Sequence, residues 1–223
     1  MSVVTLADLI VRVRDRADAT YSTFVTDTEI TRYLNESWRA LYDIIIARSW
    51  GQDYFSTSGT FVTVAGTDLY DVPGDFYRLL GLDAAIGGSI GSVTLERFPF
   101  KERTSDTSSW SCATLPRYRF RAKQIWFVPA PDGVYTITIH YIPEPTDLSG
   151  AVDLSCPNAW WEWVVIDSAI KCVVKEEGDP AALGALRASV QERVERMAPY
   201  LDAGEPSRIA YSGVTRMRRG NDL

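Results

Sequence analysis

The feature that most constrains this chain is a change of periodicity: helical spacing of apolar residues at both ends encloses a long strand-like middle. Near the N-terminus, Thr26 followed by Glu29 has the spacing of a capping box that begins a helix. One apolar stripe then continues at helical spacing through Ile30, Leu34, Trp38, Leu41 and Ile45. A shorter stripe precedes it, so the sequence predicts helices over residues 5–18 and 27–50.

Two further helices are predicted near the C-terminus. Pro157 fits the first turn of a helix over residues 157–177, and the side chains that follow it are apolar on most sides. This helix should therefore be largely buried. Pro180 begins the next helix, over residues 180–201, which Pro199 bends or ends.

Residues 55–145 instead mix β-branched and aromatic residues with clusters of Gly, Asp and Pro, which is typical of short strands joined by turns. The turn at 65–68 predicts a hairpin between the strands on either side of it, and the turn at 87–89 predicts a second one. Alternation is clearest in the last strand, where four residues share one face: Tyr135, Ile137, Ile139 and Tyr141.

Together these patterns predict an α+β fold. We expect the N-terminal and C-terminal helices to form one helical bundle that carries a central antiparallel β-hairpin region. Residues 1–202 are expected to be a single domain, followed by an extended C-terminal arm over residues 203–223.

The arm differs from the rest of the chain in charge and in apolar content. The whole chain has a formal net charge of −6, which argues against a general nucleic-acid binder. The arm has four arginines against two carboxylates, and its apolar residues are too few to build a core. A basic tail this short has weak affinity for DNA at physiological salt, so the arm is predicted to dock on a protein. The candidate docking residues are Arg208, Ile209, Tyr211, Val214, Arg216, Met217, Arg218 and Arg219.

Three tryptophans open the buried C-terminal helix: Trp160, Trp161 and Trp163. Three indoles within four residues cannot all face one stripe of a helix. They are therefore candidates both for the core and for contact between subunits, because aromatic residues are enriched at protein interfaces.

Motifs that would carry catalysis are weak. Ser89 lies in a G-x-S-x-G string, but the residues after it resemble a strand where a nucleophile elbow needs a helix. His140 is the only histidine, so it would have to serve as the base of any hydrolase triad. Glu176 and Glu177 are adjacent and point in different directions on a helix, which favours a solvated helix end over a catalytic pair.

No cofactor or metal is predicted. Nucleotide-binding and zinc-protease motifs are missing, and Cys112, Cys156 and Cys172 are far apart without any CxxC spacing. Buried free thiols are expected. No apolar run approaches the roughly 18 residues that a membrane-spanning helix needs, so no membrane contact is expected.

Four segments together resemble the head-to-tail adaptors of short-tailed phages, the head-tail connector or tail tubular protein A-like family. Thr28 to Tyr42 resembles the family's opening helix pair, and the 69–78 string LYDVPGDFYR resembles its "Tyr, Leu-Pro, x, Asp-Phe, Arg" segment, with Val72 in place of the usual Leu. The strings 125–131 and 139–145 resemble its last hairpin. A Trp-rich helix ending in VKEEGD at 174–179 and followed by an amphipathic helix is also similar.

This resemblance implies a structural virion protein without catalytic residues. It implies a ring of about twelve copies beneath the portal, closed by repeated heterologous contacts. The expected partners are the portal protein, which the arm would bind, other copies of the chain and a downstream tail or nozzle protein. DNA would be only passing cargo through a continued channel. The expected location is the virion neck, after synthesis in the host cytoplasm.

Two other functions stay open on the sequence alone. One is a phage-associated hydrolase that uses Ser89 or a carboxylate pair. The other is a neck or tail-tube structural protein of a long-tailed phage. An arm required for portal docking would favour the adaptor over the second alternative.

Overall fold

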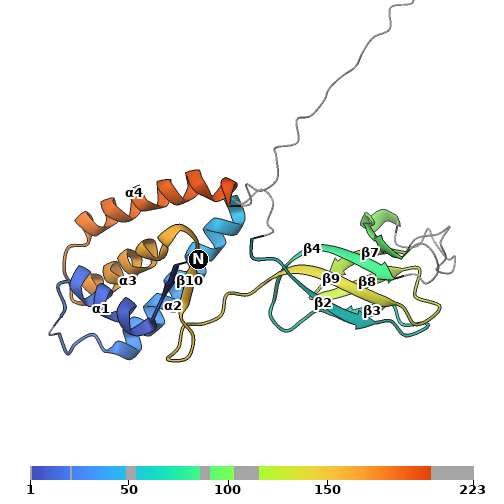
Figure 1. Cartoon of the computed structure of the whole chain (residues 1–223), viewed down its shortest axis with the longest axis horizontal. Coiled ribbons are helices and arrows are strands. Elements are labelled where there is room, and N and C mark those ends of the chain that lie inside the picture. The colour runs from blue at the N-terminus through green and yellow to red at the C-terminus, as the bar shows by residue number, and fades with distance from the viewer. Residues whose placement is uncertain (1, 21, 49–53, 86–90, 103–115, 202–223) are drawn as a thin grey trace, which may run out of the picture.

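The computed structural model of the chain describes residues 2–20, 22–48, 54–85, 91–102 and 116–201. These residues form an α+β fold, as the sequence predicts, with four α-helices and ten strands. Figure 1 shows the helices gathered in one half of the molecule and most strands in the other. Each half has its own cluster of buried apolar side chains.

The helical half is built from α1 (Leu6–Arg16), α2 (Asp27–Arg48), α3 (Trp161–Lys175) and α4 (Ala181–Met197). The central helix is α3, which packs against α1, α2 and α4. The predicted capping box is present, since the Thr26 backbone N–H donates to the Glu29 carboxylate at 3.0 Å and the Glu29 N–H donates to Thr26 Oγ1 at 3.3 Å. The predicted apolar stripe of α2 is buried in the core: Ile30, Leu34, Trp38, Leu41 and Ile45.

A small sheet that the sequence did not indicate joins the chain start to α3. Strand β1 (Ser2–Val4) pairs antiparallel with β10 (Leu154–Cys156). Strands of three residues are too short to show a periodicity, which is why no pattern predicted them.

The other half is a two-layered β-sandwich. One sheet has the order β2 (Thr57–Val62), β9 (Thr136–Pro143), β4 (Phe76–Ala85) and β5 (Ser92–Thr94). The other has the order β3 (Leu69–Asp71), β8 (Gln124–Val128), β7 (Arg117–Arg121) and β6 (Glu96–Arg97). Pairing is antiparallel except between β6 and β7, which are parallel. Both sheets contribute to one core that includes Leu82, Phe127 and Ile139.

The hairpin pattern predicted from the turns is partly wrong. Strands β4 and β5 do pair, with Asp83 opposite Thr94. The strands flanking 65–68 do not pair with each other, because β2 pairs with β9 and β3 with β8. The strings 125–131 and 139–145 likewise lie in different sheets and form no hairpin.

The chain crosses from one sheet to the other after β2. This crossing lets aromatic side chains of the two sheets bury each other's apolar surface. Phe61 of β2 and Tyr70 of β3 stack across the sandwich with ring centroids 5.3 Å apart. The Tyr70 hydroxyl also closes the connecting turn, since it accepts from the Val64 N–H at 2.8 Å and donates to a backbone carbonyl of that turn. Turn residues alone do not distinguish such a crossing from a hairpin.

The C-terminal half of α2 contacts the sandwich through aromatic side chains. The Tyr42 hydroxyl donates to the Pro143 carbonyl at 2.8 Å, and the Tyr77 hydroxyl donates to Asp43 at 2.6 Å. The two tyrosine rings meet edge to face at 5.9 Å. The bond to Asp43, together with burial, raises the pKa of Tyr77 to about 12. The two halves are therefore tied by hydrogen bonds as well as by the chain.

Within the part of the chain that the structure describes, no helix has the length and apolar content needed to span a membrane.

Candidate protein-docking site

The three tryptophans at the start of α3 have different surroundings. Trp160 and Trp163 are core residues, 2% and 3% exposed, whereas Trp161 is half-buried at the surface. The Arg12 guanidinium of α1 lies over the Trp161 ring, 4.6 Å from its centroid. Of the three indoles, Trp161 is thus the one with substantial exposed surface that another protein can touch.

An unusual turn sets the direction of these side chains. The sequence predicts a helix from residue 157, but α3 begins at Trp161, after a 3₁₀ turn over Pro157–Ala159. Asn158 and Ala159 have φ angles of 48° and 57°, in the left-handed region of backbone conformation that residues other than glycine rarely adopt. Each such residue costs on the order of 1–3 kcal/mol, and backbone strain of this kind clusters at functional sites.

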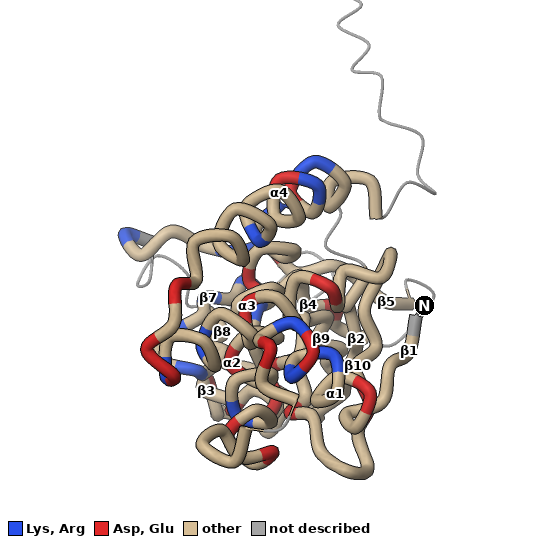
Figure 2. The backbone as a smooth tube through the Cα atoms, turned by 90° about the vertical axis from the view of Figure 1, so that its left-hand side faces the viewer, with Lys and Arg blue, Asp and Glu red and all other residues tan. Residues whose placement is uncertain are grey.

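The turn and the end of α4 border an open groove of about 660 Å³, which we call the Trp161 groove. Arg193 of α4 donates to the Glu162 carboxylate at 2.9 Å, which holds the two walls together. Figure 2, viewed from the helical end, shows basic and acidic positions side by side on the last turns of α4. The lining residues are Asn158, Ala159, Trp160, Trp161, Glu162, Arg193, Arg196 and Met197.

Two indole N–H groups at the start of α3 lack an acceptor, and one of them belongs to Trp161, which lines the groove. Nε1 of Trp161 and of Trp163 are buried and form no hydrogen bond among the described residues. A buried donor without a partner costs about 1–3 kcal/mol. Aromatic and arginine side chains beside such donors are typical of protein interfaces. The groove therefore has the composition of a docking surface.

A buried charge cluster fixes α4, and with it one wall of the groove. The Asp167 carboxylate of α3 accepts from Ser37 Oγ of α2 at 2.7 Å and from Arg187 of α4 at 2.6 Å. Lys171 Nζ lies 3.4 Å away. Burial raises the pKa of Asp167, but these hydrogen bonds and charges outweigh burial and hold it below its usual value. The ionised carboxylate thus joins three helices.

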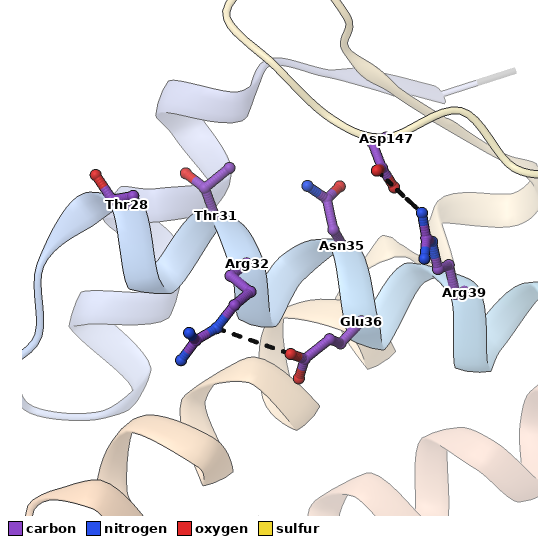
Figure 3. Close-up of a pocket in the computed structure, with 7 residues that line it drawn as sticks. All are labelled: Thr28, Thr31, Arg32, Asn35, Glu36, Arg39 and Asp147. Atoms are coloured by element: carbon purple, nitrogen blue, oxygen red, sulfur yellow. Dashed lines mark hydrogen bonds and ion pairs between the residues drawn. The ribbon is translucent and has the colours of Figure 1, made fainter.

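A second concave surface, of about 420 Å³, lies along α2 (Figure 3). Its charged groups are paired with one another: Arg39 contacts Asp147 at 2.9 Å, and Arg32 lies 3.8 Å from Glu36. Asn35 accepts from the Leu148 N–H at 2.6 Å, so the surface fastens the segment after β9 to the helix. The residues that line it are Thr28, Thr31, Arg32, Asn35, Glu36, Arg39 and Asp147. These contacts lie within the chain and stabilise its fold.

The candidate residues for catalysis are not brought together in the described part of the chain. His140 pairs with Asp83 at 3.0 Å on the sandwich, and Glu176, the residue after the end of α3, accepts a hydrogen bond from Ser22. Glu177 is exposed just past the end of α3. Ser89 lies outside the described residues.

The two described cysteines, Cys156 and Cys172, are free and buried, as predicted, and Cys112 lies outside the described residues. Burial raises the pKa of the Cys156 thiol to about 12 and that of the Cys172 thiol to about 11, so neither is a thiolate at neutral pH. The described residues contain no group of three or more His, Cys, Asp or Glu arranged to hold a metal ion.

The arm residues predicted to dock a partner lie outside the described residues. In the sequence they come after α4 and the 3₁₀ turn Ala198–Tyr200, and Met197 at the end of α4 lines the Trp161 groove. The predicted docking residues are Arg208, Ile209, Tyr211, Val214, Arg216, Met217, Arg218 and Arg219.

Comparison with protein-family models finds a match over residues 4–218 to the family described as SU10 adaptor protein. The chain belongs to the SU10 adaptor protein family. This is a family of phage head-to-tail adaptors, so the resemblance drawn from the four sequence segments is confirmed. A search of curated protein sequences returns no match to this chain.

The match to the SU10 adaptor family spans both halves of the molecule and continues well into the arm. The protein is therefore a phage structural adaptor, of a kind that acts between portal and tail proteins. Such adaptors are typically not enzymes.

The tryptophans of this SU10-family chain are visible in its sequence, but the groove beside them is not. The signal was present in part, because Arg193, Arg196 and Met197 are three and four residues apart on α4 and share a face. The left-handed turn at Asn158 and Ala159 carries no such signal, since neither residue requires positive φ.

Proposed function

We propose that this chain is a head-to-tail adaptor that assembles as a ring of about twelve copies on the phage portal, by repeated heterologous contacts. The ring provides the attachment surface for the tail and continues the channel through which DNA passes. The observation that carries this proposal is the family match over residues 4–218, which includes most of the arm as well as the folded part.

In this proposal the portal is bound by the arm. Its isolated apolar residues and its arginines suit an extended segment that docks into a groove of a partner. Ile209, Tyr211, Val214 and Met217 supply the apolar anchors. The four arginines Arg208, Arg216, Arg218 and Arg219 supply hydrogen bonds and charge.

Contacts between neighbouring copies are proposed to include the Trp161 groove. Trp161 itself touches the neighbour through the exposed part of its half-buried ring, beside the Arg12 guanidinium. Trp160 and Trp163 hold the α3 end in place from within the core. The Trp161 groove is small and contains both basic and acidic side chains. Such a surface suits a weak contact that forms after portal binding has brought neighbouring copies together.

The isolated protein is expected to be monomeric or weakly associated and to assemble when portal is present. The reason is that an arm which orders on binding contributes affinity only after the entropy cost of ordering is offset by portal contacts. Light scattering of the protein alone, and then with portal rings of the same phage, measures both states.

A stable ring at micromolar concentration without portal would contradict this expectation about assembly. Failure of the full-length protein to associate with portal rings under any condition would contradict the proposed function itself.

A further inference from the structure

The sheet β2-β9-β4-β5 ends in two strands, β2 and β5, that have no further partner strand among the described residues. An edge strand pairs readily with another strand unless charges, proline or a cover protect it. Neither edge has a protecting residue. The stretches 54–67, around β2, and 84–95, around β5, contain no charged residue and no proline.

The other sheet of the sandwich has edges of the ordinary, protected kind. Its edge strand β3 ends in Asp71 and follows Asp68, and its opposite edge strand β6 consists of Glu96 and Arg97. Because the two sheets belong to one sandwich, the difference in edge charge points to a role for the uncharged pair.

Hydrogen bonds within the sheet show which backbone groups face the free edges. The Thr63 N–H donates to the Tyr135 carbonyl of the chain leading into β9. Because antiparallel positions alternate, Ser58, Thr60 and Val62 direct their N–H and C=O groups away from β9. At the other edge the Leu95 N–H donates to the Leu82 carbonyl, so the outward groups there are those of Ser92 and Thr94.

The side chains at both edges have matching orientation. Thr60, Val62, Ser92 and Thr94 are exposed, whereas the residues between them, Phe61 and Val93, are half-buried on the inner face. If the two edges are joined, exposed positions lie opposite exposed positions and Phe61 lies opposite Val93. The outer face then stays polar and the inner face apolar.

Strand direction matches as well. With four antiparallel strands, β5 runs opposite to β2. The β5 edge of one copy and the β2 edge of the next therefore meet as an antiparallel pair. Both matches depend on the even number of strands in the sheet. With an odd number, the two edge strands would run in the same direction, and the residues whose backbone groups point outward would have side chains on opposite faces of the sheet.

We propose that β5 of one copy pairs with β2 of the next, with Thr94 opposite Thr60 and Ser92 opposite Val62. The four-stranded sheets of successive copies then form one continuous sheet around the ring, which removes the free edges. This inference rests on the proposed ring. Only two residues of β5 face outward, so each junction is small and suits copies that associate weakly until the portal gathers them.

The test is a disulfide between copies. In a Cys112→Ser background, Thr60→Cys and Thr94→Cys are combined in the full chain, assembled on portal rings and oxidised. A hydrogen-bonded antiparallel pair has Cα atoms about 5.5 Å apart, within the range that a disulfide spans. We expect a ladder of covalent multimers on a non-reducing gel. Ser58→Cys with Thr94→Cys tests the register shifted by two residues, and a ladder from it also supports strand pairing.

Matched variants test each step of the design. Each single cysteine variant, and the pair Asp71→Cys with Glu96→Cys on the edges of the other sheet, should give no ladder. Thr60→Pro removes an N–H that no described strand of the same copy uses, and should weaken assembly severalfold. Thr60→Ala keeps that N–H and should assemble like the unchanged protein.

Rings that form on the portal yet give no ladder from either cysteine pair would overturn the strand pairing and leave the adaptor function standing. Absence of portal association by the unchanged protein would instead overturn the proposed function.

Discussion

Deletion of residues 204–223 is expected to abolish attachment to the portal while leaving the midpoint of thermal unfolding nearly unchanged. The apolar residues of the arm are few and isolated, so little burial is available to stabilise residues 1–202. Attachment, in contrast, is proposed to rest on the aromatic, apolar and arginine residues of the arm.

Co-sedimentation with portal rings measures the attachment of the truncated protein, and circular dichroism on heating measures its fold. A matched control replaces the arm with a Gly-Ser segment of equal length, which separates the loss of side chains from the loss of chain. Full portal binding by a truncated, folded protein would contradict the proposal that the arm binds the portal.

Replacement of Trp38 by Ala is expected to lower the free energy of unfolding by about 3–5 kcal/mol, the usual cost of removing a large aromatic side chain from a core. Trp38 is 6% exposed in the middle of the α2 stripe. Its ring meets Tyr42 edge to face at 5.6 Å, and Tyr42 in turn bonds to the sandwich. The variant should therefore loosen both the helical core and its contact with the sheets.

His140→Ala is the matched control for stability. The His140 side chain is 44% exposed, and its pair with Asp83 lies at the surface of the sandwich, where such pairs contribute little. We expect a change within about 0.5 kcal/mol. The denaturant midpoints of Trp38→Ala and His140→Ala measure the two changes. Equal midpoints would contradict the assignment of Trp38 to the core.

The helical half could be predicted from sequence because its signals are local. The Thr26 capping box and the apolar stripe from Ile30 to Ile45 involve residues three and four positions apart, and the structure buries that stripe. The start of α3 was harder, because the left-handed Asn158 and Ala159 delay it by several residues beyond Pro157.

The pairing of the strands depends on contacts distant in sequence. The turn at 65–68 has the composition of a hairpin turn, yet Phe61 and Tyr70 stack across two sheets. Likewise, the Trp161 groove unites the start of α3 with the end of α4, and only tertiary packing brings those segments together. The single-domain boundary at residue 202 and the docking roles of the arm residues stay predictions.

Electron cryo-microscopy of the neck of intact phage particles tests the adaptor function most directly. We expect density for this chain as a closed ring directly beneath the portal, with residues 203–223 of each copy lying against portal subunits. Density that places the chain in the tail tube or outside the neck, or a ring whose contact with the portal does not involve the arm, would contradict it.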